Sequence, residues 1–116
     1  MRETFFDAYI TAALWSSTDD DDRPLDDHYD ATDIAPATLA QMRADCADFE
    51  TAQAETLAQA GADDQNGHDF WLTRNRHGAG FWDRGYPDAI GRTLTDAAHA
   101  YGSFDLYIGD DGQVYA

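Results

Sequence analysis

The run FWLTRNRHGAGFWDR, residues 70–84, decides the predicted fold class. Its two aromatic stretches, Phe70–Arg74 and Gly80–Arg84, are rich in residues that favour β-strands. Between them, Asn75–Gly78 has the composition of a hairpin turn. The run therefore predicts two antiparallel strands.

The sequence that follows predicts one helix and a second pair of strands. Apolar residues recur at helical spacing over Thr93–Tyr101, and we expect this helix to begin near Pro87. Phe104–Ile108 is expected to form a third strand, Gly109–Gly112 a turn, and Val114–Tyr115 a short closing strand. This part of the chain therefore extends the antiparallel sheet.

The sequence that precedes the run predicts two helices. Apolar residues at spacings of three and four indicate one helix over about Glu3–Ser16 and a longer one over about Pro36–Ala60. Proline is favourable at the first helical position, because its missing N–H would have no partner there. Gly61 is a suitable residue to end the second helix.

These elements predict a single α+β domain over residues 1–116, with two N-terminal helices, a small antiparallel sheet and one further helix. Residues 19–33 are expected to form a loop, and Ala62–Asp69 a polar linker. The domain divides by composition into an acidic helical half, 1–69, and a sheet half, 70–116.

Charge is the strongest signal in the composition. The chain has 23 acidic residues against 7 basic ones, all of them arginine, and a formal net charge of −16. Residues 1–69 hold 17 acidic residues and three arginines, whereas residues 70–116 hold six and four. Such a chain repels nucleic acid and anionic membranes and attracts basic protein surfaces. No stretch reaches the roughly 18 apolar residues of a membrane span, and the N-terminal stretch lacks the basic region followed by apolar residues of a secretion signal. We therefore expect a cytoplasmic protein.

We expect the partner-binding residues to be carboxylates. Duplex DNA carries one negative charge per roughly 1.7 Å of its axis, and a row of carboxylates can imitate it in a basic groove. The predicted set is a cluster in the loop and a second row on the long helix: Asp19, Asp20, Asp21, Asp22, Asp26, Asp27, Asp30 and Asp33, with Asp45, Asp48, Glu50 and Glu55. Two other interpretations stay open, a solvated repulsive loop and adaptation to a salty cytoplasm. The second of these should acidify both halves alike.

An enzyme centred on His77 is the alternative from another class. Histidines, carboxylates and arginines gather near it in the sequence, at His68, Asp69, Arg74, Arg76, Asp83 and Arg84. A histidine with a carboxylate partner can act as a general base, and arginines can hold an anion. No Gly-x-Ser-x-Gly, His-Glu-x-x-His or phosphate-loop pattern accompanies them. We therefore assign no catalytic residue and expect a protein that is not an enzyme.

The sequence gives no support for a metal or another cofactor. A calcium-binding EF-hand loop needs a central glycine and a closing glutamate, but Asp19–Asp30 has Pro24 and Asp30 in those places. The lone Cys46 excludes an internal disulfide and a zinc site with several cysteines, and its helical, apolar surroundings predict a buried thiol.

Three stretches resemble a family of small acidic proteins of bacteriophages and prophages. They are ALWSSTDD at 13–20, HDFWLTRNRHGAGFWDR at 68–84 and DLYIGDDGQVY at 105–115. The resemblance implies a phage setting and no catalytic residue. By analogy with other small acidic phage proteins, it implies an inhibitor of a host defence complex such as a CRISPR effector. A phage accessory protein that binds a partner without mimicking DNA is the remaining alternative.

Overall fold

The computed structural model describes residues 4–19, 21–61, 65–76, 80–81 and 86–116. These residues form five α-helices, two short 3₁₀ helices and one two-stranded antiparallel sheet. The elements, in chain order, are α1 Thr4–Ser16, η1 Leu25–Asp27, η2 Ala31–Asp33, α2 Pro36–Ala52, α3 Ala54–Gln59, α4 Gln65–Arg74, α5 Asp88–His99, β1 Tyr107–Ile108 and β2 Val114–Tyr115.

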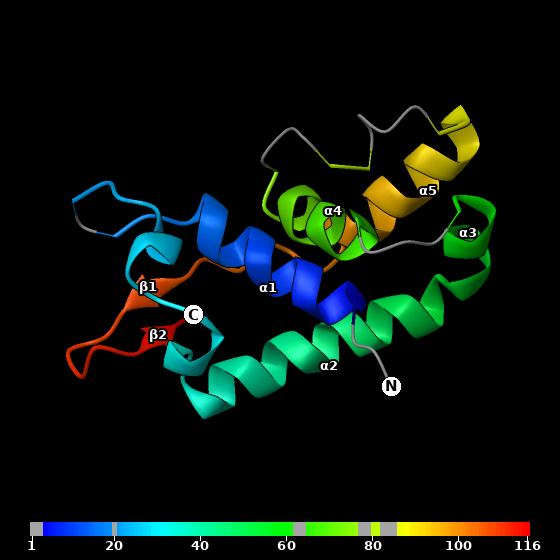
Figure 1. Ribbon diagram of the computed structural model, residues 1–116. Coiled ribbons are helices and arrows are strands. Elements are labelled where there is room, and N and C mark those ends of the chain that lie inside the picture. The colour runs from blue at the N-terminus through cyan, green and yellow to red at the C-terminus, as the bar shows by residue number, and fades with distance from the viewer. Residues whose placement is uncertain (1–3, 20, 62–64, 77–79, 82–85) are drawn as a thin grey trace.

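Helix α1 lies at the centre of the fold, between α2 on one side and α4 on the other (Figure 1). Aromatic side chains from all three helices fill the space between them. The ring of Phe49 on α2 stacks on that of Phe70 on α4, with centroids 4.2 Å apart, and Tyr9 on α1 lies 5.3 Å from Phe70. One cluster of buried residues runs from Phe5 to Val114, so both halves of the sequence contribute to the same core.

The helices predicted at the N-terminal side are confirmed. The first helix spans Thr4–Ser16 within the described residues, and the second begins at Pro36 as predicted. The second is interrupted at Gln53, where φ of −110° and ψ of 19° leave the α-helical region and separate α2 from α3. Gly61 follows α3 with φ of +80°, the left-handed conformation expected where a helix ends.

The predicted strand Phe70–Arg74 is wrong, and so is most of the predicted linker before it. Residues 65–74 form α4 instead. Every residue from Asp69 to Arg74 is buried, so the run shows no alternation between a solvated and a buried face. When every residue of a run is buried, its periodicity cannot show whether the run is a strand or a helix. The prediction then depended on the aromatic composition, which favours a strand.

Glycine at position 67 lets α4 approach α1. A Cβ atom there would lie 1.8 Å from the carbonyl oxygen of Phe5, which is far inside van der Waals contact. The glycine that suggested a linker is therefore required by helix packing.

The remaining predicted strands are only partly present. Gly80 and Phe81 form no strand: the buried Phe81 donates its N–H to Thr73 Oγ1 at 3.1 Å, and the rest of Gly80–Arg84 lies outside the described residues. The predicted strand Phe104–Ile108 shortens to Tyr107–Ile108 because the partner strand, Val114–Tyr115, has only two residues. The protein is thus mainly helical, with a small sheet.

The helix near the C-terminal side and the final turn are confirmed. Helix α5 begins at Asp88, directly after Pro87, and ends at His99. Gly112 donates its N–H to the carbonyl of Gly109 at 3.0 Å and has φ of +81°, so this turn needs glycine at its last position.

Candidate interaction surface

The first part of the acidic loop is held in one conformation by one of its own carboxylates. Oδ1 of Asp19 accepts the backbone N–H groups of Asp21 at 2.8 Å and of Arg23 at 3.1 Å. These hydrogen bonds, that from Arg23 first, lower the pKa of Asp19. A bridge between Thr18 and Pro24 closes the turn. Asp20 lies outside the described residues.

A second turn of the loop is built in the same way. The side chain of Asp30 accepts the hydroxyl and the backbone N–H of Thr32, and Oδ2 of Asp33 accepts the N–H of Asp30 at 2.9 Å. This is a capping box at the start of η2. The hydroxyl of Thr32, followed by its N–H, lowers the pKa of Asp30. Between the two turns, Leu25 is 1% exposed and fixes the loop to the core.

Four carboxylates of the loop are left on its surface. Asp21, Asp22, Asp26 and Asp27 are exposed, and within the described part of the chain their carboxylates take part in no hydrogen bond or ion pair. The loop therefore contains aspartates whose carboxylates accept hydrogen bonds and build its turns, and aspartates whose carboxylates accept none.

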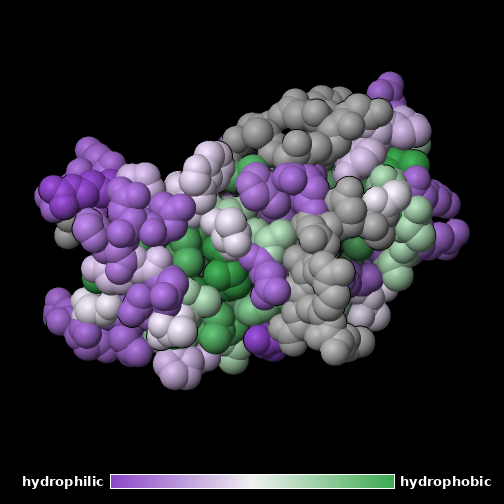
Figure 2. Space-filling model, in the orientation of Figure 1, coloured by the Kyte–Doolittle hydropathy of each residue, from purple (hydrophilic) through white to green (hydrophobic). Residues whose placement is uncertain are grey.

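The C-terminal hairpin joins the loop at the same end of the molecule (Figure 1). The N–H of Ala35 donates to the carbonyl of Val114 at 2.9 Å, and Ile34 and Val114 form a parallel bridge. We call segments 18–33 and 107–115 together the acidic end. The described residues of the acidic end include nine carboxylates, among them Asp110 and Asp111, against the basic side chains of Arg23 and His28. Figure 2 shows hydrophilic residues gathered at this end.

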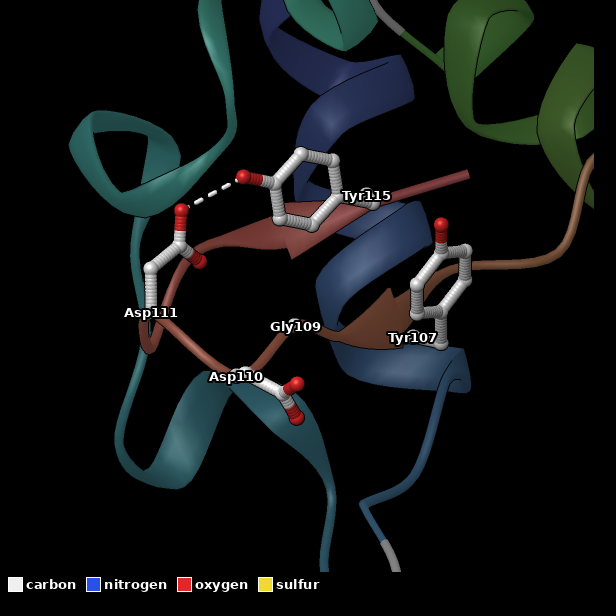
Figure 3. A pocket seen from close by; sticks show the side chains of 5 residues that line it. All are labelled: Tyr107, Gly109, Asp110, Asp111 and Tyr115. Carbon is white, nitrogen blue, oxygen red and sulfur yellow. Dashed lines mark hydrogen bonds between the residues drawn. The ribbon is translucent and has the colours of Figure 1, made fainter.

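The hairpin also forms a hollow of about 300 Å³, lined by Tyr107, Gly109, Asp110, Asp111 and Tyr115 (Figure 3). The two tyrosine rings stack with centroids 5.8 Å apart and an angle of 22° between their planes. The hydroxyl of Tyr115 donates to Oδ2 of Asp111 at 2.5 Å. This hydrogen bond lowers the pKa of Asp111 and raises that of Tyr115.

The predicted second row of carboxylates is not a continuation of the first. Oδ2 of Asp45 lies 2.8 Å from Nη1 of the buried Arg74, and Asp48 accepts the hydroxyl of Tyr101 at 2.5 Å. Both side chains therefore join α2 to neighbouring parts of the fold. Glu50 and Glu55 are exposed, on α2 and α3. Helix α2 leads away from the acidic end, so these four residues do not join the loop carboxylates (Figure 1).

The residues of the enzymatic alternative divide in the structure. Arg74 is 3% exposed and donates to Tyr9, Asp45 and the carbonyls of Tyr101 and Gly102, so it does not hold an external anion. Nδ1 of His68 lies 3.9 Å from Oδ1 of the fully buried Asp69. Arg76 is exposed directly after α4, and His77, Asp83 and Arg84 lie outside the described residues.

Two features of the structure were missed by sequence reasoning. The first is the hollow of the hairpin, since Asp110 and Asp111 were assigned only to a turn and Tyr107 only to a strand. A predicted hairpin with a tyrosine on each strand already implies that the two rings and the carboxylates of the turn lie close together. The buried ion pair of Arg74 has a weaker signal, a charged residue directly after an apolar run.

Among the residues that the structure describes, no group of three or more histidine, cysteine, aspartate or glutamate side chains is placed to hold a metal ion. No helix in the described ranges has the length and apolar character needed to cross a membrane. Comparison with known protein families, with curated proteins and with solved structures finds no match to this chain.

Proposed function

We propose that this protein is a phage-encoded inhibitor whose acidic end occupies the basic DNA-binding groove of a host defence complex. The observation that carries the proposal is the meeting of loop 19–33 and the C-terminal hairpin at one end of the fold. At this end, the loop and the hairpin bring together carboxylates that are far apart in the sequence. The phage setting comes from the resemblance of the three quoted stretches.

The order of the loop supports mimicry over a merely solvated segment. A flexible acidic loop would lose conformational entropy when it enters a groove, and this loss would weaken binding. In this loop the turns at Asp19 and Asp30 and the buried Leu25 already fix the backbone. The exposed carboxylates are thus presented on a surface that is ordered before the partner arrives.

The position of the charge also supports a local role. Adaptation to high salt places acidic residues over the whole surface, whereas here they gather at the acidic end, with few basic residues among them. An enzyme centred on His77 remains the rival from another class, and it predicts an activity that the loop carboxylates do not affect.

The test compares two variants that each remove four charges. The loop variant carries Asp21→Asn, Asp22→Asn, Asp26→Asn and Asp27→Asn, which leaves the turn-forming Asp19, Asp30 and Asp33 intact. Asparagine also suits position 22, where φ is +61°. The helix variant carries Asp7→Asn, Glu55→Gln, Asp88→Asn and Asp96→Asn, all at exposed helical positions away from the loop.

The immobilised proteins are used to capture partners from a bacterial lysate at low and high salt, and duplex DNA is then added as a competitor. We expect duplex DNA to release the partner captured by the parent. Exposed ion pairs contribute roughly 0–1 kcal/mol each, so the loop variant should bind that partner about ten- to a hundredfold more weakly. Its dependence on salt should also be shallower, and the helix variant should bind like the parent.

Equal binding by the parent and the loop variant across the salt range would overturn the proposal. So would a captured partner that duplex DNA does not displace. In that case the loop is a solvated segment, and His77→Ala would decide whether the enzymatic alternative holds.

A further inference from the structure

We propose that the hollow of the C-terminal hairpin receives an arginine side chain, whose guanidinium group stacks on Tyr107 and pairs with Asp110. That this arginine belongs to the partner rests on the proposed function. The affinity of the hollow for a guanidinium group does not, and it can be tested on the isolated protein.

The exposed ring of Tyr107 is the first observation. Its side chain is 56% exposed, and among the described residues only Trp15 is a comparably exposed large apolar side chain. Tyr107 stands opposite Tyr115 in the strand pair and stacks on it through one face. The ring is therefore held in a defined orientation while it remains available to a ligand.

The second ring is fixed from two sides. Its hydroxyl donates to Asp111, and its edge lies against Gly109, where a Cβ atom would come within 2.4 Å of a Tyr115 ring carbon. Glycine at this position is thus required for the ring to lie where it does. Packing against Gly109 and the hydrogen bond to Asp111 therefore fix the shape of the hollow.

The carboxylates determine which ligand fits. Asp111 is engaged by Tyr115 and by the N–H of Gln113, which favours its ionised form. Figure 3 shows Asp110 apart from the hydrogen-bonded Asp111–Tyr115 pair, and within the described ranges its carboxylate has no hydrogen-bond donor or ion-pair partner. Negative charge beside an aromatic face attracts a cation and repels a phosphate group.

Arginine suits the hollow better than lysine does. A guanidinium group is planar, stacks on aromatic rings and presents five donors, whereas an ammonium group is compact and strongly hydrated. One guanidinium group can lie on Tyr107 and donate at the same time to the carboxylate of Asp110, which lines the same hollow. DNA-binding grooves are rich in arginine, so the hollow would add a specific contact to the general attraction of the acidic end.

The experiment is an NMR titration of the ¹⁵N-labelled full chain at constant ionic strength. The ligands are Nα-acetylarginine amide, Nα-acetyllysine amide and Nα-acetylcitrulline amide, and the last keeps the shape of arginine without its charge. We expect arginine amide to shift the backbone amides of residues 107–115 in a saturable way, with a Kd in the millimolar range. Lysine amide should bind more weakly, and citrulline amide should cause no saturable shift.

Three variants locate the contact. Removing the ring with Tyr107→Leu should weaken arginine binding about two- to fivefold, in line with an exposed cation–π contact, whereas Tyr107→Phe should retain it. Trp15→Leu, which removes the other exposed ring, should leave binding unchanged. Circular dichroism confirms that each variant is folded, as expected for substitutions at exposed positions.

The inference would be overturned if arginine amide and lysine amide bound with equal affinity and Tyr107→Leu left that affinity unchanged. The hollow would then attract positive charge without recognising the guanidinium group. Shifts confined to residues 19–33, or a saturable shift with citrulline amide, would also overturn the inference. These outcomes are independent of the loop variant, so failure here and failure of the proposed function can be distinguished.

Discussion

The guanidinium group of Arg74 lies 2.8 Å from the carboxylate of Asp45 and joins α4 to α2 inside the fold. The same guanidinium donates to Tyr9 and to the carbonyls of Tyr101 and Gly102. One side chain thereby connects α1, α2, α4 and the segment that follows α5.

Arg74→Met should therefore destabilise the protein strongly. The substitution removes all four hydrogen-bonding interactions and leaves the carboxylate of Asp45 without its cation. Breaking a buried pair in this way costs about 3–5 kcal/mol. Urea unfolding measures the change, and Arg76→Met, at an exposed position two residues later, should change stability by less than about 0.5 kcal/mol. A similar small effect of both substitutions would mean that the pair contributes little.

Gly67→Ala should also destabilise the protein, although alanine is the better helix former by about 1 kcal/mol. The added methyl group would overlap the carbonyl of Phe5 and push α4 away from α1. Overpacking of this kind costs about 1–3 kcal/mol, so we expect a net loss in the free energy of unfolding. A variant as stable as the parent would show that the two helices can separate without cost.

The loop should lose order in acid. The pKa values of Asp19 and Asp30 lie below the ordinary value of 3.8 because backbone and side-chain donors stabilise the charged forms. Their stabilising contribution is therefore complete above about pH 4, and it is lost as the pH falls through the lowered pKa values. NMR titration of the carboxyl carbons, with hydrogen exchange of the Arg23 and Thr32 amides, measures this. Values of 3.8 or higher for both residues would contradict the turn geometry.

Salt should stabilise the folded protein. With 23 acidic and 7 basic residues, repulsion between like charges opposes the compact state, and salt screens it. The loop variant should melt at a temperature no lower than the parent in low salt and should gain less from added salt. The helix variant should change less, because its four charges lie on three different helices. A loop variant that melts well below the parent would show that these carboxylates stabilise the fold.

Cys46 provides a test of whether the chain is one cooperative domain. The thiol is 1% exposed, and burial, followed by the charges of Glu50 and Asp45, raises its pKa. It should not react with a thiol reagent at pH 8 until the protein unfolds, and its exposure in urea should coincide with the loss of circular dichroism. Reaction in urea that leaves the circular dichroism native would indicate two separately unfolding parts, and two transitions in calorimetry would agree with it.

The parts of the fold that could be predicted are those with a solvated face or a specific turn residue. The stripe of α2, its start at Pro36 and the turn before Gly112 depend on local chemistry, and the structure confirms them. Helix α4 could not be predicted because it is buried all around and so loses its periodicity. The partners of Arg74 could not be predicted either, since they lie in other segments of the chain.

The acidic end could be predicted in composition but not in extent. The eight aspartates of residues 19–33 are evident in the sequence. Asp110 and Asp111 join them only because Ile34 pairs with Val114, which lies far along the chain. The separation of turn-forming from exposed aspartates was equally hidden, because it depends on which carboxylates accept backbone N–H groups.

The bridge between Ile34 and Val114 joins residues 80 positions apart, so the acidic end is completed only after the C-terminal hairpin has been synthesised. The loop leaves the ribosome long before the hairpin does, and the N–H of Ala35 can reach the carbonyl of Val114 only once the hairpin has been made. Contacts of such long range form late, since the intervening chain must first be brought together. A nascent or truncated chain would therefore carry the charge of the loop without the carboxylates of the hairpin beside it, and only chains that fold to the last strand would present the whole acidic end.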